Sequence, residues 1–196
     1  MKYIFDFDDT LFDQTRFKRH IYTVVEAKTG IPADQVEKKY QKVRGGLFSL
    51  KEFIANFLAA NPRKSLGTSM GEIYDEIMEK CPVFVNKELL AEIEKLPKED
   101  LWIMTYGEEE FNRAKVEQSG IGKFFNKVQI RVVSGSKKEW VAQTCAEFPE
   151  EIIIFVDNRQ DFIQEVTREK SKNLRTILYD ENGLQKFREA IQQGVT

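Results

Sequence analysis

Short, largely apolar runs, widely spaced along the chain, are the feature that most constrains how this sequence can fold. Runs of this kind suit strands that are buried on both faces, as in a parallel sheet. The clear runs, followed by a weaker alternating one, are Tyr3–Phe7, Leu101–Met104, Ile152–Val156, Thr176–Tyr179 and Val128–Val133. Helical patterns separate them, for example Trp140–Phe148 and Phe162–Val166, and another follows at Leu184–Ile191. This alternation predicts an α/β core with a Rossmann-like, doubly wound parallel sheet.

The segment from residue 14 to residue 83 differs, because it contains no convincing strand. Apolar residues such as Phe17, Ile21 and Val24 recur there at helical spacing. Ser49 and Ser69 each stand three residues before a glutamate, which is the pattern of a helix-capping box. We therefore expect a core formed by residues 1–13 and 84–196, with an all-helical cap of residues 14–83 inserted after the first strand.

Composition limits the partners of the chain. Its 196 residues carry a net charge of −2, so no basic excess favours nucleic acid or an anionic membrane. Cys81 and Cys145 form no CxxC motif, and the apolar run at 152–156 is far too short to cross a bilayer. The N-terminus has acids where a signal peptide needs an apolar stretch. We expect a cytoplasmic protein, and the sequence leaves its oligomeric state open.

Residues with polar side chains or a free backbone amide stand where the predicted strands end, and a lysine precedes the helix that begins near Trp140. They are Asp6, Asp8, Thr105, Tyr106, Gly107, Lys137, Asp157 and Asp161. In an open α/β sheet, ligands bind beyond the carboxyl ends of the strands. Clustered carboxylates repel one another unless a cation lies among them, and hard oxygen donors suit Mg²⁺ shared with a phosphate. Hydroxyl and amide groups near Gly107 could bind phosphate oxygens, and Lys137 could neutralise their charge.

Each of these residues also has a plain structural explanation. Aspartate is common in turns at strand ends, as Asp6 and Asp8 would be. Thr105 could cap a helix, and Asp161 could be an exposed acid in a first helical turn. Lys137 and Lys138 are adjacent, and their spacing from the following helix favours Lys137 only modestly.

Taken in order, these segments resemble the four motifs of the haloacid dehalogenase superfamily, whose members are mostly magnesium-dependent phosphohydrolases. The sequence DFDDT at residues 6–10 matches the first motif, DxDx[TV]. The strand ending at Thr105, the lysine in SGSKKEWV, and Asp157 with Asp161 match the other three. The helical insert is similar to the cap of the first subclass. The chain departs from the common pattern at Asp9, where glycine is commoner, and at Asn158, where many members have a second aspartate.

The resemblance implies a role for each motif residue. Asp6 would be the nucleophile that forms an aspartyl-phosphate, and Asp8 would be the general acid and then the base. Lys137 would join the phosphate to Asp6. The phosphate-binding set would be Thr105, Tyr106, Gly107 and Lys137. The Mg²⁺ ligands would be Asp6, the backbone carbonyl of Asp8, and Asp157, with Asp161 as a further ligand or an outer neighbour.

Other functions fit parts of this pattern. A phosphotransferase or phosphomutase keeps every motif, so the sequence does not exclude either. A dehalogenase needs neither magnesium nor a second acid, and a receiver domain has another motif order. A non-catalytic regulatory member that only binds metal or a phosphorylated ligand would usually have lost Asp6 or Asp8. We expect Mg²⁺-dependent hydrolysis of a small-molecule phosphate monoester, with specificity set by the cap, where Arg44 beside Gly45 and Gly46 could contact an anionic substrate.

Overall fold

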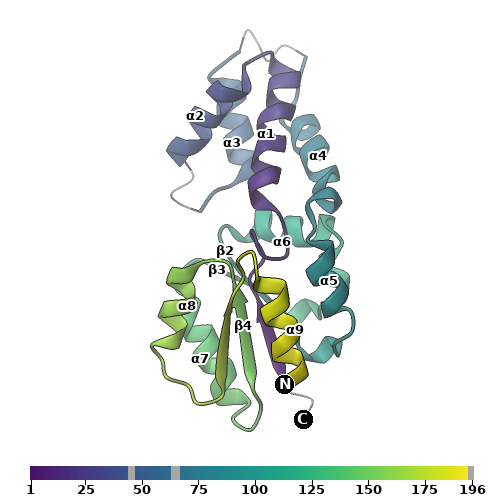
Figure 1. Ribbon diagram of the computed structural model, residues 1–196. Coiled ribbons are helices and arrows are strands. Elements are labelled where there is room, and N and C mark those ends of the chain that lie inside the picture. The colour runs from purple at the N-terminus through teal and green to yellow at the C-terminus, as the bar shows by residue number, and fades with distance from the viewer. Residues whose placement is uncertain (44–46, 63–66, 194–196) are drawn as a thin grey trace.

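The computed structural model shows a group of helices on top of an α/β core, with the N-terminus and the end of α9 at the side of the core that faces away from these helices (Figure 1). The structure describes residues 1–43, 47–62 and 67–193. Arg44, Gly45 and Gly46 lie outside these residues, so the suggested contact between Arg44 and a substrate stays a prediction.

The core contains one parallel sheet with the strand order β3-β2-β1-β4-β5. Its strands are β1 (Lys2–Phe5), β2 (Leu101–Tyr106), β3 (Ile130–Val133), β4 (Ile153–Asp157) and β5 (Leu174–Leu178). The chain moves outward from β1 to β3 and then crosses to β4, on the other side of β1. This reversal opens a crevice at the carboxyl ends of β1 and β4. The doubly wound sheet predicted from the apolar runs is thus confirmed, including the weaker run that becomes β3.

Helices cover both faces of this sheet. In the described residues the α-helices are α1 (Gln14–Thr29), α2 (Ala33–Val43), α3 (Leu50–Ala59), α4 (Met70–Glu79), α5 (Lys87–Ile93), α6 (Glu109–Gln118), α7 (Lys138–Glu147), α8 (Gln160–Thr167) and α9 (Gly183–Gln193). The described residues also form short 3₁₀ helices: η1 (Cys81–Phe84), η2 (Lys98–Asp100), η3 (Ile121–Phe124) and η4 (Lys127–Gln129). Among these helices, none combines the length and the apolar composition that a membrane span requires.

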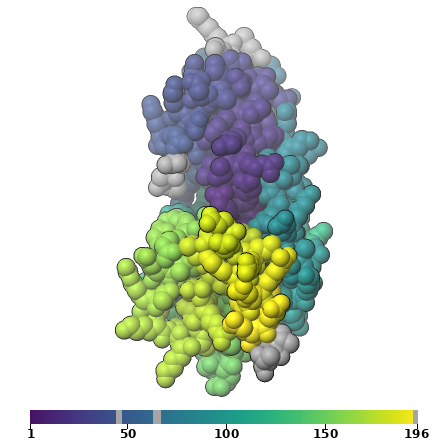
Figure 2. Space-filling view, in the orientation of Figure 1, coloured from purple at the N-terminus to yellow at the C-terminus, as the bar shows by residue number. Residues whose placement is uncertain are grey.

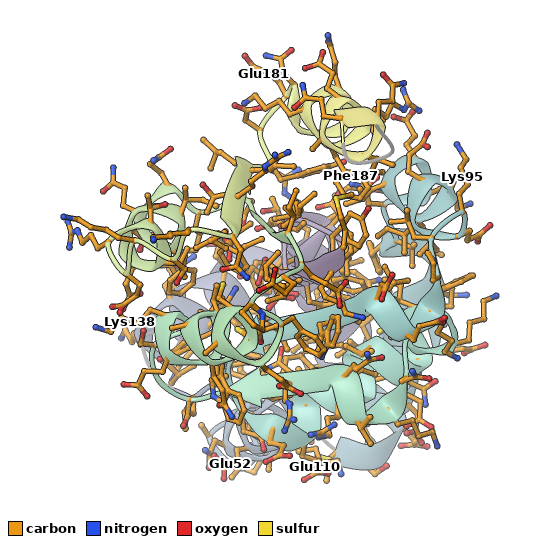
Figure 3. All side chains as sticks on the ribbon, turned by 90° about the horizontal axis from the view of Figure 1, so that it is seen from below. Glu52, Lys95, Glu110, Lys138, Glu181 and Phe187 are labelled. Atoms are coloured by element: carbon orange, nitrogen blue, oxygen red, sulfur yellow. The ribbon has the colours of Figure 1, made fainter. Side chains whose placement is uncertain are left out.

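Strand β1 sends alternate side chains into two separate cores. Ile4 packs with residues of α7 and α8, whereas Tyr3 and Phe5 belong to the core on the opposite face. There Phe187 of α9 points inward (Figure 3), and its ring meets those of Tyr3 and Phe5 edge-on at centroid distances of 6.0 and 5.3 Å. The same apolar cluster continues upward into the cap helices. Burial on both faces explains why the inner strands β1 and β4 are mostly apolar, whereas the edge strands β3 and β5 include the exposed residues Arg131 and Arg175.

The ends of the cap helices follow from local chemistry. The side chain of Asp13 accepts a backbone N–H of the first turn of α1 at 2.8 Å. That helix ends at Gly30, whose φ of +65° lies in the left-handed region that favours glycine. The predicted capping box at α4 is confirmed, because Ser69 and Glu72 bond each other's backbone N–H at 3.2 and 2.8 Å.

Two chain segments connect the cap to the core, and they lie side by side. Phe12 forms an antiparallel bridge with Val85. The N–H of Asp13 donates to the carbonyl of Phe84 at 2.7 Å. The side-chain amide of Asn86 donates to the carbonyl of Thr10 at 2.9 Å. The chain therefore enters and leaves the cap at one place, next to the carboxyl ends of the strands.

Candidate active site

The carboxyl ends of β1, β2 and β4 border a cavity that lies between core and cap. Its volume is about 310 Å³, and Asp6, Asp8 and Thr105 line it from the core. Lys18 of α1 and Tyr40 of α2 line it from the cap. In Figure 2 the purple surface of the first helix meets the green and yellow core at this junction. A larger cavity of about 620 Å³ lies beside α6 and β3 but contains none of the predicted site residues, so chemistry rather than size identifies the candidate site.

The loop that follows β1 is fixed by its own backbone. The carbonyl of Phe7 accepts the N–H groups of Leu11 and Phe12 at 3.0 and 2.9 Å, and the N–H of Asp9 donates to the carbonyl of Phe12 at 2.7 Å. Asp9 has a φ of +57°, in the left-handed region where glycine is favoured and aspartate is tolerated better than most residues. Its carboxylate accepts the N–H of Thr15 at 3.0 Å, which anchors α1 to the loop. The departure from the family pattern at Asp9 therefore fits the backbone.

Lys137 is a buried cation that joins two carboxylates. Its Nζ donates to Asp6 Oδ1 at 2.5 Å and to Asp157 Oδ2 at 2.7 Å. These three side chains are at most 7% exposed. Lys138, in contrast, is 40% exposed, points outward from α7 (Figure 3) and pairs with Glu169 at 3.5 Å. The geometry thus favours Lys137 over its neighbour as the site lysine.

The carboxylates of this cluster are crowded. Burial, the largest effect, raises the pKa of Asp6 to about 7, against the opposing charge of Lys137 and with repulsion from Asp157 adding to the rise. Burial alone would lower the pKa of Lys137, but its two carboxylate partners together raise it. One buried ammonium therefore does not balance the negative charge that gathers at this edge of the sheet.

This charge balance and this set of oxygen donors fit Mg²⁺. The carboxylates of Asp6 and Asp157 lie side by side because a single nitrogen binds both. Within residues 1–43, 47–62 and 67–193, no three acidic, histidine or cysteine side chains form a metal cluster. An ion at this site would therefore have the two carboxylates of Asp6 and Asp157 as side-chain ligands and would need further oxygens from the backbone, from water or from a ligand. Mg²⁺ is commonly held in this way, since it keeps several waters and shares substrate phosphates.

Asp161 does not join this cluster. Its carboxylate binds the guanidinium of Arg159, with Oδ1 at 3.0 Å from Nε, and its side chain is 64% exposed. That hydrogen-bonded pair lowers the pKa of Asp161. Asp161 is also not among the residues that line the cavity. Asp161 thus lies apart from the carboxylates of Asp6 and Asp157, because the first turn of α8 directs it toward solvent, and its role as a metal ligand or outer neighbour stays a prediction.

The predicted phosphate-binding residues differ in what they offer. Thr105 is fully buried, and its hydroxyl has no hydrogen-bond partner in the described part of the chain, so it is available to a ligand in the cavity. Tyr106 also lines the cavity. The N–H of Gly107 instead donates to the carbonyl of Val133 at 3.0 Å, so this amide already has a partner, and phosphate binding at Gly107 stays a prediction. Glycine is needed there for another reason, since a Cβ would lie 2.2 Å from the side-chain nitrogen of Asn112.

Comparison with known proteins explains this combination of motifs. A family model for haloacid dehalogenase-like hydrolases matches residues 3–177. The chain belongs to this family. A search of curated proteins found no match.

Solved structures of haloacid dehalogenase-like proteins share the fold at low sequence identity. A haloacid dehalogenase-like protein from Burkholderia xenovorans LB400 is 14% identical with a TM-score of 0.67, over 93% of this chain and 86% of that one. YfnB from Bacillus subtilis, solved with bound magnesium, is 15% identical with a TM-score of 0.60, over 97% of each chain. The 2-haloacid dehalogenase from Pseudomonas syringae pv. tomato DC3000 is 14% identical with a TM-score of 0.59, over 98% and 99%. Such likeness establishes the fold of this haloacid dehalogenase-like hydrolase, not its substrate.

One functional candidate was missed by sequence reasoning. Lys115 of α6 is 1% exposed, and its Nζ donates to Asp8 Oδ1 at 2.6 Å and to Gln14 Oε1 at 3.3 Å. The available signal was its position one turn after Phe111, on the face of α6 that is buried. Charged side chains are rarely buried unless they are paired, so a lysine on that face called for an acidic partner.

Proposed function

We propose that this hydrolase cleaves small-molecule phosphate monoesters through an aspartyl-phosphate on Asp6, with Mg²⁺ as cofactor. The observation that carries the proposal is the position of Asp8, which lines the same cavity as Asp6 and Thr105, whose hydroxyl has no partner among the residues that the structure describes. A nucleophilic carboxylate, a second acid and a phosphate-binding hydroxyl are what this reaction needs in one place.

In the first step an oxygen of Asp6 attacks phosphorus. The bond between phosphorus and the leaving oxygen breaks, its electron pair goes to that oxygen, and Asp8 supplies the proton. In the second step Asp8 takes a proton from water, whose oxygen attacks phosphorus. The bond to Asp6 then breaks, which restores its carboxylate and releases inorganic phosphate.

The residues around Asp6 support the need for a cation. Because burial raises the pKa of Asp6 to about 7 in the metal-free protein, an added positive charge would favour the ionised form that can attack. Mg²⁺ held by Asp6, Asp157 and the backbone carbonyl of Asp8 would supply that charge and neutralise the phosphoryl group.

The cavity also supports a small substrate. A volume of about 310 Å³, bordered by Lys18 and Tyr40 of the cap, suits a small organic phosphate rather than a phosphorylated protein surface. The net charge of −2 offers no general attraction to nucleic acid or to an anionic membrane. We therefore propose that the substrate is a small phosphorylated molecule and that the protein acts in the cytoplasm.

Release of inorganic phosphate from a panel of phosphate monoesters tests the proposal. We expect wild type to release phosphate with Mg²⁺, to stop when the metal is chelated, and to recover when Mg²⁺ is restored. Asp6→Asn should abolish release while folding normally, because an amide of the same shape cannot attack phosphorus. Turnover by Asp6→Asn would contradict the aspartyl-phosphate route.

Two other results would indicate different chemistry on the same core. Halide release from a 2-haloacid without Mg²⁺ would indicate a dehalogenase, for which Asp8 has no evident use. Transfer of phosphate to an added alcohol in preference to water would indicate a phosphotransferase, which uses the same residues.

A further inference from the structure

Lys115 is held in one position by three kinds of contact. Its ammonium donates to Asp8 Oδ1 at 2.6 Å and to Gln14 Oε1 at 3.3 Å. The centroid of the Phe111 ring lies 5.0 Å from the same nitrogen, with the ring of Phe7 at 5.5 Å. Since the side chain is 1% exposed, water cannot replace these partners. The position of Nζ is therefore set by the fold rather than by a flexible surface side chain.

The two oxygens of Asp8 are placed differently. Oδ1 accepts the buried ammonium of Lys115, whereas no hydrogen bond reaches Oδ2 from the residues that the structure describes. The Asp8 side chain is 29% exposed and borders the cavity, so its second oxygen is free to meet a ligand or water there. A carboxyl group that gives up and takes back a proton needs one oxygen free for that exchange, and a fixed rotamer to aim it.

We propose that Lys115 is a positioning residue for proton transfer: by binding Oδ1 of Asp8, it leaves Oδ2 as the oxygen that exchanges the proton with substrate and water. The inference rests on the proposed function, in which Asp8 protonates the leaving oxygen. Lys115 touches neither substrate nor phosphorus and acts only through Asp8.

A purely structural role explains these contacts less well. Burying an ammonium is unfavourable unless its partners compensate for the lost water, and an apolar residue of similar volume often serves a core equally well. The rings of Phe7 and Phe111 would accept such a residue. Asp8, being partly exposed, could be solvated from the cavity without a lysine. The distinctive effect of Lys115 is thus to fix which way the Asp8 carboxyl faces.

The test compares two phosphate esters that differ in leaving group. The value of kcat/KM reports the steps up to loss of the alcohol, where Asp8 acts as acid. Phenyl phosphate has a poor leaving group that needs this proton, whereas 4-nitrophenyl phosphate has a good one that needs it less. We expect Lys115→Met to lower kcat/KM for phenyl phosphate about tenfold more than for 4-nitrophenyl phosphate. The ratio of the two values does not depend on how much of a preparation is folded.

Three further variants separate positioning from stability. Lys115→Arg keeps the charge and should restore part of the ratio. Lys115→Met in an Asp8→Asn background should change the ratio little, because the residue through which Lys115 acts is gone. Val116→Ala, a cavity-forming change at the next residue of α6, should leave the ratio at the wild-type value.

The outcomes are distinct. An equal loss on both esters in Lys115→Met, or the same selective loss in Val116→Ala, overturns the inference and leaves the phosphatase intact. If wild type itself hydrolyses neither these probes nor any ester of the panel, the proposed function fails, and the inference fails with it.

Discussion

Two buried lysines, Lys115 and Lys137, bind carboxylates that follow strand β1, and their surroundings differ. Lys137 lies between Asp6 and Asp157, which are almost fully buried, so negative charge remains in excess around it. Lys115 meets a single carboxylate, that of Asp8, which reaches the cavity. The comparison teaches that an incompletely balanced cluster is suited to take up a further cation, whereas a balanced pair is suited to hold one side chain in place.

The largest difference between the two regions is expected when each lysine is replaced by methionine. In metal-free protein, Lys137→Met leaves two buried carboxylates without a cation and should lower the free energy of unfolding by about 3–5 kcal/mol. Lys115→Met leaves a carboxylate that water can reach and places a methionine among aromatic rings, so about 1 kcal/mol is expected. Urea denaturation with a chelator measures both.

The matched control for this comparison is Lys138→Met. Lys138 lies next to Lys137 but is 40% exposed, so its replacement should change stability by less than about 0.5 kcal/mol. Added Mg²⁺ should restore more stability to Lys137→Met than to Lys115→Met. Equal losses in the two methionine variants would mean that the comparison between the clusters is wrong.

An effect of intermediate size is expected when the stability of the Asp6 cluster is measured as a function of pH. Because the folded pKa of Asp6 is about 7 and its ordinary value is 3.8, the folded state binds a proton more tightly than the unfolded chain between these values. The stability contributed by this group is complete below about pH 4 and is lost as the pH rises through 7. We expect the melting temperature of chelated wild type to fall from pH 5 to pH 8.

The controls for the pH series are Asp6→Asn and Mg²⁺. Asp6→Asn cannot titrate, so its melting temperature should fall less over the same range. Bound Mg²⁺ should flatten the wild-type curve, because it favours the ionised carboxylates. A curve for Asp6→Asn that parallels chelated wild type would assign the pH dependence to other groups.

The smallest effect is expected at Asp161, outside both clusters. An exposed ion pair such as that of Arg159 and Asp161 contributes little to stability. Asp161→Asn should change the free energy of unfolding by no more than about 0.5 kcal/mol. It should also leave the Mg²⁺ concentration for half-maximal activity within about twofold of wild type. A tenfold rise in that concentration would instead support Asp161 as a metal ligand.

The sequence predicted the parts of the site that depend on strand ends. Asp6, Thr105 and Asp157 follow apolar runs, and parallel strands bring their carboxyl ends to one edge, so topology alone places them together. The choice of Lys137 over Lys138 needed the structure, because adjacent residues at the start of a helix differ in direction rather than in spacing.

The parts that the sequence could not predict depend on side-chain direction and on hydrogen bonds between distant segments. Helix α6 has Asn112 and Lys115 on its buried face, which weakens the apolar period by which helices are recognised, so Lys115 remained unnoticed. The amide of Gly107 is used by β3, and Asp161 is held by Arg159. The first pairing joins segments far apart in the chain, and the second depends on the direction of two neighbouring side chains.

The bridge between Phe12 and Val85 has a consequence for how the sequence of this protein can evolve. The chain leaves the core and returns to it at adjacent points. The length of the helical insert can therefore change without changing the order of the strands. Lys18 and Tyr40, which border the cavity, belong to this insert, whereas Asp6, Lys137 and Asp157 belong to the core. Evolution can therefore change the cap side of the cavity as a unit while Asp6, Lys137 and Asp157 stay where the sheet places them.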